Sequence, residues 1–268
     1  MSRPPVSVTI ITLNEEKNIV RAVKSVLWAD EVLVVDSGST DRTLELARAL
    51  GAKVMTNPWP GYGKQKNFAQ AQAAHDWILN IDADEEVSPE LSQEILAALE
   101  GVDSKASERA EATTARGFYF PRKTYYLGKW IEHGGWYPNF LTRMANRKFA
   151  RWSEPAVHEA LLVDGPVKKL SLPLLHYTFS NIQDQILTNL KYSQEGYQEL
   201  LKKGQRPSLI RLLLKPAGKF IETYFIKKGF MDGLAGFIIS INAAHSMFLK
   251  YAYLIEADLN HERIDHRQ

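Results

Sequence analysis

Cysteine is missing from all 268 residues of the chain. Disulfides and thiolate metal sites are therefore excluded, and a reducing compartment is the simpler expectation. Long apolar runs are missing too, because no 18 consecutive residues are free of polar interruption. The N-terminal Met-Ser-Arg-Pro-Pro-Val also lacks the apolar core of a signal peptide. We therefore expect a protein that stays in the cytoplasm.

A strong charge of either sign is also absent, because the formal net charge is only +2. We expect no nucleic-acid partner from this balance. The pattern Gly-x-Gly-x-x-Gly does not occur, which argues against a dinucleotide-binding dehydrogenase. Any phosphate groups that the protein binds must then be met by a metal ion and by basic side chains.

The first hundred residues alternate between apolar strands and helices. Such alternation predicts an α/β fold with a doubly wound, mostly parallel sheet and helices on both faces. Right-handed crossovers place the strand ends on one edge, where Asn14, Asp36 and Asp82 become neighbours. The expected strands are Val6–Leu13, Glu31–Val35, Ala52–Thr56 and the run ending at Asp82, and the expected helices are those ending near Leu27 and those at Thr43–Leu50, Lys64–Ala74 and Ser88–Leu99.

The stretch Trp77–Glu86 begins with apolar residues and ends in acidic ones. Asp82 and Asp84 follow a buried strand, and ligands bind at the carboxyl ends of strands in an open α/β sheet. Residues two apart in an extended chain point to the same side, so the two carboxylates should converge and hold Mg²⁺ or Mn²⁺. The alternative is an acidic turn that precedes a helix N-terminus.

Polar residues in the second half of the chain are candidates for an acceptor site. Gly101–Arg116 is polar without apolar periodicity and predicts a flexible linker. Beyond it, Gly134, Gly135 and Trp136 follow His133, and such glycines allow close approach of a ligand to the backbone. Aromatic faces suit sugar rings, although aromatic residues also form cores.

Arg151–Glu159 contains two glutamates and a histidine, namely Glu154, His158 and Glu159. A carboxylate here can serve as a general base, or the segment can be a solvated loop with ion pairs. His176 follows an apolar strand, where a histidine is either a core residue or a further metal ligand.

The C-terminal part of the sequence is helical, with helices expected at Gln185–Lys202 and Leu209–Lys228. Residues 202–228 carry eight bases against one acid, interleaved with large apolar residues. A basic, apolar helix is typical of a membrane-surface element, whereas packing on the protein's own domain is the alternative. Gly229–Leu249 contains Asp232, which makes spanning costly, so we expect it to lie on the membrane or against its own domain.

Three motifs in order resemble family 2 glycosyltransferases, which have the GT-A fold. They are Thr9–Glu16, Val35–Asp41 and Asp82–Asp84. His133–Trp136, Glu154–Glu159 and the helix region at Asp232-Gly233 are similar to the narrower group of bacterial lipopolysaccharide-core β-glucosyltransferases. The resemblance implies a catalytic domain over residues 1–180, with a nucleotide-sugar half (1–100), a linker (101–116) and an acceptor half (117–180), and a membrane-associating helical region over 181–268.

The resemblance also implies roles by position. It implies an inverting, metal-dependent transferase that moves a sugar onto a lipid-linked glycan such as the lipopolysaccharide core. The first candidate for the donor is UDP-glucose. The enzyme would sit peripherally on the cytoplasmic face of the bacterial inner membrane and contact anionic lipid. Glu159 would be the catalytic base, with Glu154 as its rival. The nucleotide sugar would be bound by Thr12, Leu13, Asn14, Glu15, Asp36, Lys66, Asn67, Asp82 and Ala83. The ligands of Mg²⁺ or Mn²⁺ would be Asp84, Asp82 and His176. The acceptor would be faced by Gly134, Gly135, Trp136, Glu154 and His158.

Two other classes of protein remain open from the residues alone. A nucleotidyltransferase also uses an α/β sheet with acidic metal ligands, but it would show a glycine-rich basic loop where Asn14–Glu16 stands. A non-catalytic sugar- or lipid-binding protein on the same fold would not need Asp84 together with a base.

Overall fold

The structure is a computed structural model, which describes residues 3–102, 115–154 and 159–265 and their side chains as far as residue 260. The chain packs as two compact units. The first comprises Met1–Lys123 and Asn139–His176, and the second comprises Thr124–Pro138 and Tyr177–Gln268. The predicted linker Gly101–Arg116 and the predicted acceptor residue His158 lie largely or wholly outside the described residues.

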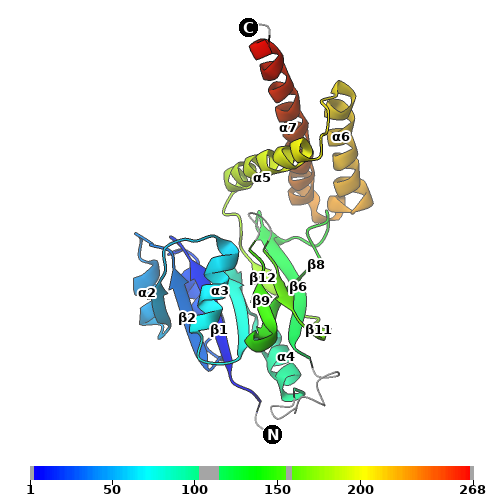
Figure 1. The fold of residues 1–268 in the computed structure, drawn as a ribbon. Helices are drawn as coiled ribbons and strands as arrows, with labels where there is room; N and C mark the ends of the chain where they lie inside the picture. The colour runs from blue at the N-terminus through cyan, green and yellow to red at the C-terminus, as the bar shows by residue number, and fades with distance from the viewer. Residues whose placement is uncertain (1–2, 103–114, 155–158, 266–268) are drawn as a thin grey trace. The chain divides into compact units, whose positions relative to one another are not determined.

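A mixed sheet forms the centre of the first unit (Figure 1). Its strand order is β3-β2-β1-β4-β8-β6-β12-β5, and β1 pairs in parallel with β2 and with β4. The antiparallel partner of β4 is β8. The strands of the parallel part are β1 (Val6–Thr12), β2 (Glu31–Asp36), β3 (Lys53–Thr56) and β4 (Trp77–Asp82).

The remaining strands of the first unit extend the sheet or cover it. A short strand, β5 (Glu85–Glu86), follows β4 after a turn at residues 83–84. The others are β6 (Gly117–Tyr126), β8 (Asn139–Asn146), β11 (Val167–Lys169) and β12 (Leu174–His176), together with a separate hairpin of β9 (Ala150–Trp152) and β10 (Leu161–Val163) that follows the 3₁₀ turn at Arg147–Phe149.

Successive side chains of a strand point to opposite faces of the sheet, so apolar strand residues need cover on both faces, and helices provide it. Val8, Ile10 and Leu79 belong to the large core on one face, and Leu33 and Val35 belong to a smaller cluster with Ala69 of α3 on the other. The helices are α1 (Ile19–Ser25), α2 (Thr43–Ala49), α3 (Tyr62–Gln72) and α4 (Pro89–Glu100). The predicted N-cap Ser88 is confirmed, because its side chain accepts from the Leu91 backbone N–H.

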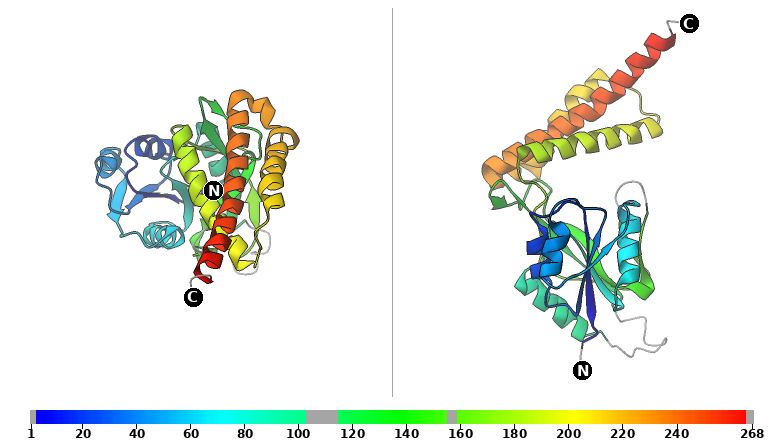
Figure 2. Two further views of the ribbon diagram at one scale, coloured as in Figure 1. Left: turned by 90° about the horizontal axis from the view of Figure 1, so that it is seen from above. Right: turned by 90° about the vertical axis from the view of Figure 1, so that its left-hand side faces the viewer.

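The second unit is built mainly of three long helices. They are α5 (Ile182–Lys202), α6 (Leu209–Ile221) and α7 (Gly233–Asp265), and α7 lies between the other two (Figure 2). A π-helical turn (Glu222–Ile226) and a 3₁₀ turn (Gly229–Asp232) connect α6 to α7. The hairpin at the end of β6, which includes β7 (Lys129–Trp130), also belongs to this unit.

The expected fold class is confirmed: an α/β sheet with helices on both faces and a C-terminal helical region. The predicted division after residue 180 stays a prediction. No helix within the described residues combines the length and the hydrophobicity that crossing a bilayer requires.

Candidate active site

The loops after β1 and β2 hold each other at one edge of the sheet. Asn14 adopts a left-handed backbone (φ 56°), which asparagine tolerates better than most residues. Its backbone N–H donates to the Ser39 Oγ at 2.7 Å, and its Oδ1 accepts from the Thr40 N–H at 2.9 Å. The predicted neighbourhood of Asn14 and the loop after Asp36 is therefore observed.

Asp36 is fully buried and orders its own loop. Its Oδ2 accepts from the backbone N–H groups of Gly38 and Ser39, both at 2.8 Å, and its Oδ1 accepts from the Ser39 hydroxyl. A contact between Asp36 and the nucleobase of a nucleotide sugar stays a prediction, and it requires the loop to open a path to the carboxylate. Leu13 is 48% exposed beside it, and the buried hydroxyl of Thr12 has no partner among the described residues.

Glu15 lies close to the acidic turn after β4. Burial raises the pKa of its carboxyl, and the negative charge of Asp84 raises it further, although a hydrogen bond from Asn18 acts in the opposite direction. The end of β1 therefore adds to the negative potential around Asp84, as a site for a cation requires.

Asp82 stands between two buried cations. Its Oδ1 lies 3.1 Å from the Lys66 Nζ, and its Oδ2 accepts from the Arg143 guanidinium at 2.7 Å. Burial alone would raise the pKa of Asp82, but the charges of Arg143 and Lys66 outweigh it and hold the pKa far below its ordinary value. Asp82 is therefore ionised at every physiological pH.

The Lys66 ammonium also reaches the predicted base. Its Nζ donates to the Glu159 Oε1 at 2.8 Å and lies 4.5 Å from the centre of the Trp152 ring. Lys66 is almost completely buried, so its three N–H groups depend on these partners. Helix α3 thus connects Asp82 at the end of β4 with Glu159 in the second half of the chain.

Asn67 and Gly63 attach the β9 strand to α3. The Asn67 amide accepts from the Trp152 backbone N–H at 2.8 Å and donates to the Trp152 carbonyl and the Glu154 carboxylate, each at 3.0 Å. A Cβ atom at Gly63 would lie 2.1 Å from the Ser153 carbonyl oxygen, so only glycine allows this approach. The expected contact of Asn67 with a nucleotide sugar stays a prediction.

Asp84 pairs with His176 instead of converging with Asp82. The His176 Nε2 lies 3.2 Å from the Asp84 Oδ2. The chain is not extended here, because β4 ends at Asp82 and residues 83–84 form a turn, and the two carboxylates have different partners. A metal shared by Asp82 and Asp84 stays a prediction. Among the described residues, no three histidine or acidic side chains are close enough to share a metal ion.

The pair Asp84 and His176 nevertheless suits a divalent cation as two of its ligands. A carboxylate oxygen and an imidazole nitrogen at this separation leave the remaining positions to diphosphate oxygens and water, as in sites that bind a metal together with a phosphorylated substrate. The imidazole favours Mn²⁺ over Mg²⁺, whose ligands are nearly always oxygens.

The predicted acceptor residues Gly134, Gly135 and Trp136 belong to the second unit. The Gly134 N–H donates to the Lys227 carbonyl at 2.8 Å, and Gly135 has φ 83° beneath the Lys227 side chain. Trp136 packs on Tyr126, 5.7 Å between ring centres. These contacts give the three residues a structural role within their own unit, and their acceptor role stays a prediction.

Sequence reasoning missed two charged residues of the site, Arg143 and Glu85. Arg143 lies on β8 and also donates to the Glu85 Oε1 at 2.9 Å, and Glu85 is fully buried. Removing one partner of such a buried pair costs about 3–5 kcal/mol, because the other charge remains without compensation. An arginine inside an otherwise mostly apolar strand was the available signal, since it needs an acidic partner.

Comparison with known proteins identifies the family. The family model described as glycosyl transferase family 2 matches residues 7–159. An uncharacterized glycosyltransferase of Rickettsia bellii is 36% identical over 264 residues, which cover 95% of this chain and 87% of that protein. The chain therefore belongs to the family 2 glycosyltransferases, its sheet domain has their GT-A fold, and it is a transferase enzyme.

A curated relative and a solved structure are also similar to this chain. The lipopolysaccharide core biosynthesis glycosyltransferase LpsC of Rhizobium meliloti is 30% identical over 94% of this chain and 92% of its own length. Glucosyl-3-phosphoglycerate synthase from Mycobacterium tuberculosis, solved with Mn²⁺, UDP and phosphoglyceric acid, is 20% identical and superposes with a TM-score of 0.45 over 66% of this chain and 72% of that one.

Proposed function

We propose that the protein is an inverting glycosyltransferase that moves a sugar onto a hydroxyl of a lipid-linked glycan of the lipopolysaccharide core. The first candidate for the donor is UDP-glucose. The observation that carries this proposal is the connection of Glu159 through Lys66 to Asp82. Asp82 is two residues before Asp84, which is paired with His176. This connection brings a candidate base and a candidate cation site onto one sheet edge. The name of the LpsC relative supports the acceptor class.

Asp84 and His176 would hold the divalent metal, which when bound would neutralise the charge of the leaving diphosphate. Lys66 would add a second positive charge to the diphosphate. In the free protein this ammonium is bound to Asp82 and Glu159, so a diphosphate competes with both carboxylates for it. Asp82 keeps Arg143 as a partner when Lys66 turns away, whereas Glu159 is released.

The released Glu159 carboxylate would then accept the proton of the acceptor hydroxyl. The hydroxyl attacks the anomeric carbon from the face opposite the leaving diphosphate, which inverts its configuration. A single displacement of this kind needs one base and no protein nucleophile, and the site offers Glu159 for that role. Glu154 is exposed and hydrogen-bonded to Asn67, which makes it the less suitable candidate.

A donor panel tests the proposed function. UDP-glucose, UDP-galactose, UDP-N-acetylglucosamine and GDP-mannose are each incubated with the protein and Mn²⁺, and nucleotide release is measured with and without EDTA. We expect slow release of UDP from one UDP-sugar in the presence of Mn²⁺, and we expect EDTA to abolish this release. Release that EDTA leaves unchanged, or no selectivity among the four donors, contradicts the proposal.

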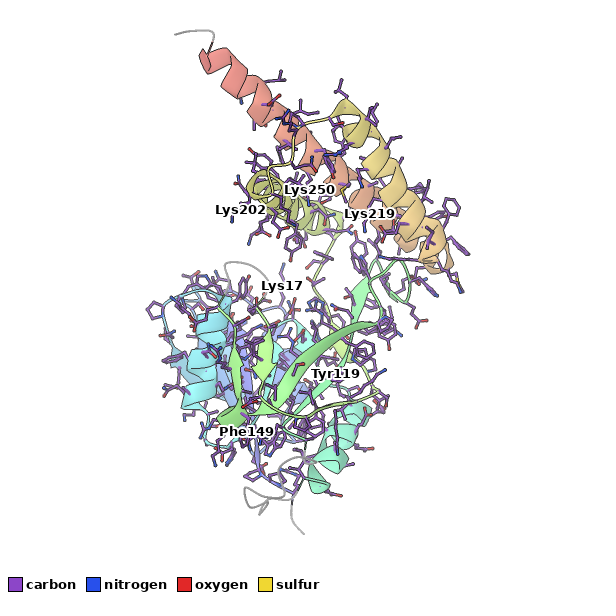
Figure 3. All side chains as sticks on the ribbon, turned by 45° about the vertical axis from the view of Figure 1, so that its right-hand side comes forward. Lys17, Tyr119, Phe149, Lys202, Lys219 and Lys250 are labelled. Carbon is purple, nitrogen blue, oxygen red and sulfur yellow. The ribbon has the colours of Figure 1, made fainter. Side chains whose placement is uncertain are left out.

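We further propose that the second unit carries the enzyme to the anionic, cytoplasmic face of the inner membrane. None of the residues of α6 is buried, and its apolar side chains project from the helix, as Figure 3 shows around the labelled Lys219. Leu209, Ile210, Leu213 and Leu214 are each at least 65% exposed. Exposed apolar residues among lysines and arginines are typical of a helix that lies in a bilayer interface.

The membrane proposal predicts salt-dependent binding to anionic vesicles. Each lysine or arginine near an anionic surface contributes about 1 kcal/mol, and salt weakens this attraction. We expect flotation with vesicles that contain phosphatidylglycerol, weak flotation with neutral vesicles, and partial release in high salt. Replacing Lys215, Lys219, Lys227 and Lys228 by glutamate should abolish flotation and spare hydrolysis of free UDP-sugar.

Four lysines of the first unit provide a matched control. Changing Lys17, Lys24, Lys53 and Lys148 to glutamate alters the net charge equally but leaves the basic helices unchanged. This variant should float like the parent. Equal flotation of the parent and of the variant at positions 215, 219, 227 and 228 would show that the basic side chains of residues 215–228 are merely solvated.

A further inference from the structure

A buried carboxylate closes the turn that carries Asp84. The Asp82 backbone N–H donates to the Glu85 Oε2 at 2.9 Å, so the side chain of Glu85 bridges the turn at residues 83–84. Glu85 itself has no exposed surface. A charged group at such a position is retained only when cations and hydrogen bonds compensate its loss of water.

Arg143 supplies the compensating charge and joins both ends of the turn. Its guanidinium donates to the Asp82 Oδ2 at 2.7 Å and to the Glu85 Oε1 at 2.9 Å. The charges of Asp82 and Glu85 outweigh the effect of burial and raise the pKa of Arg143 above its ordinary value. Arg122 adds a longer contact of 3.4 Å to the same Glu85 oxygen.

The backbone of the same glutamate pairs with the strand that carries His176. Glu85 and His176 are directly opposite each other in the antiparallel pairing of β5 with β12. The His176 Nε2 is in turn 3.2 Å from the Asp84 Oδ2. Glu85 therefore holds the turn of Asp84 through its side chain and stands in register with His176 through its backbone.

We propose that Glu85 and Arg143 are positioning residues, a clamp that presets Asp84 and His176 for the metal and diphosphate of the donor. The inference rests on the proposed function, because it concerns the same site. Neither residue touches the reacting atoms. Their effect is to remove the freedom of a two-residue turn, so that the two ligands are already placed when the donor arrives.

The variant that tests the clamp removes one charge of each sign. The double change Glu85→Leu with Arg143→Met removes the oxygen that accepts from the Asp82 N–H and the guanidinium that bridges to it, and it leaves no uncompensated buried charge, since Asp82 keeps Lys66. A partly exposed ion pair at the opposite end of the same two strands serves as control, because Arg147 after β8 lies 3.2 Å from Asp76 before β4. The control variant is Asp76→Asn with Arg147→Met.

Two readouts are measured on each protein. In metal-free protein, hydrogen exchange of the peptide that spans Asp82–Glu86 should become at least tenfold faster in the clamp variant and stay unchanged in the control. With UDP present, Mn²⁺ affinity measured by electron paramagnetic resonance should fall about 10–100-fold in the clamp variant, the usual effect of losing groups that orient metal ligands. The control should bind Mn²⁺ like the parent.

Unchanged exchange together with unchanged Mn²⁺ affinity in the clamp variant would overturn the inference while the parent still binds Mn²⁺ and UDP. Failure of the parent to bind either one would instead refute the proposed function, and the exchange measurement would still decide whether the clamp orders the turn. If the double variant does not fold, Arg143→Lys replaces it. A lysine keeps the charge, but its side chain is one bond shorter than that of arginine. Its ammonium therefore cannot take the place of the terminal guanidinium nitrogen that donates to both carboxylates, and the same two changes are expected.

Discussion

Glu159→Gln is expected to lower kcat by about 10²–10⁴-fold, the usual contribution of general base catalysis, while UDP-sugar binding stays nearly intact. The amide keeps the size of the carboxylate and still offers an oxygen to the Lys66 ammonium. It cannot accept a proton, so the acceptor hydroxyl stays protonated as it attacks. The measurement is the steady-state rate of sugar transfer with separate determination of the donor KM.

Glu154→Gln is the matched control for this prediction. Glu154 lies on the same segment and is hydrogen-bonded to Asn67, but it is exposed and has no contact with Lys66 among the described interactions. Its variant should retain activity within a few-fold of the parent. A dead Glu154→Gln enzyme beside an active Glu159→Gln enzyme would reverse the assignment of the base.

Asp84→Asn is expected to lower turnover by about 10²–10³-fold, because a metal ion contributes several kcal/mol to the stabilisation of a leaving phosphate and each 1.36 kcal/mol is a factor of ten. The amide removes the negative charge of one ligand and leaves the His176 imidazole without its carboxylate partner. The fold should remain intact, since Asp84 contributes no cap or core contact. Raising Mn²⁺ to millimolar concentration should restore part of the activity.

Asp76→Asn tests whether the effect at Asp84 is specific. Asp76 immediately precedes β4, pairs with Arg147 and Lys148 at the surface, and stands far along the strand from the acidic turn. Its variant should show the parent's rate and the parent's dependence on Mn²⁺. Full activity of Asp84→Asn in the presence of EDTA would remove the basis for a metal at this site.

The first hundred residues allowed the sheet to be predicted almost strand by strand, because their hydrophobic periodicity is local information. The strand ending at Asp82 and the cap at Ser88 are confirmed within a residue. The contact between the loops after β1 and β2 was also predictable, since parallel strands with right-handed crossovers end at one edge. In these elements, neighbours in sequence determine the structure.

The ion pairs that complete the site could not be predicted in the same way, because their partners are far apart in the chain. Lys66 and Glu159 are separated by 93 positions and Arg143 and Glu85 by 58. The periodicity of a strand shows which side chains face inward, but it does not show which buried cation meets which acid. The turn between β4 and β5 was missed for another reason. Glu85 turns the chain by accepting from the Asp82 N–H, and a run of acidic residues does not show which of them binds the backbone.

The helical region illustrates a different limit. Its basic and apolar composition was evident, and α6 is indeed exposed along its length. The segment predicted as one helix over Leu209–Lys228 instead changes to a π-helical turn at Glu222–Ile226, and Gly229–Asp232 forms a separate 3₁₀ turn. The helical path ends at Lys228, whose backbone is left-handed (φ 57°), and the carboxylate of Asp232 then accepts from the backbone N–H groups of Glu132 and His133.

The most direct test of the central claim, that the sheet edge around Asp84 and Lys66 binds a nucleoside diphosphate with a divalent metal, is a calorimetric titration of the protein with UDP. We predict binding in the presence of Mn²⁺, loss of binding when EDTA replaces the metal, and at least tenfold weaker binding by Asp84→Asn in Mn²⁺. Equal binding of UDP by the parent with Mn²⁺ and with EDTA would contradict the account.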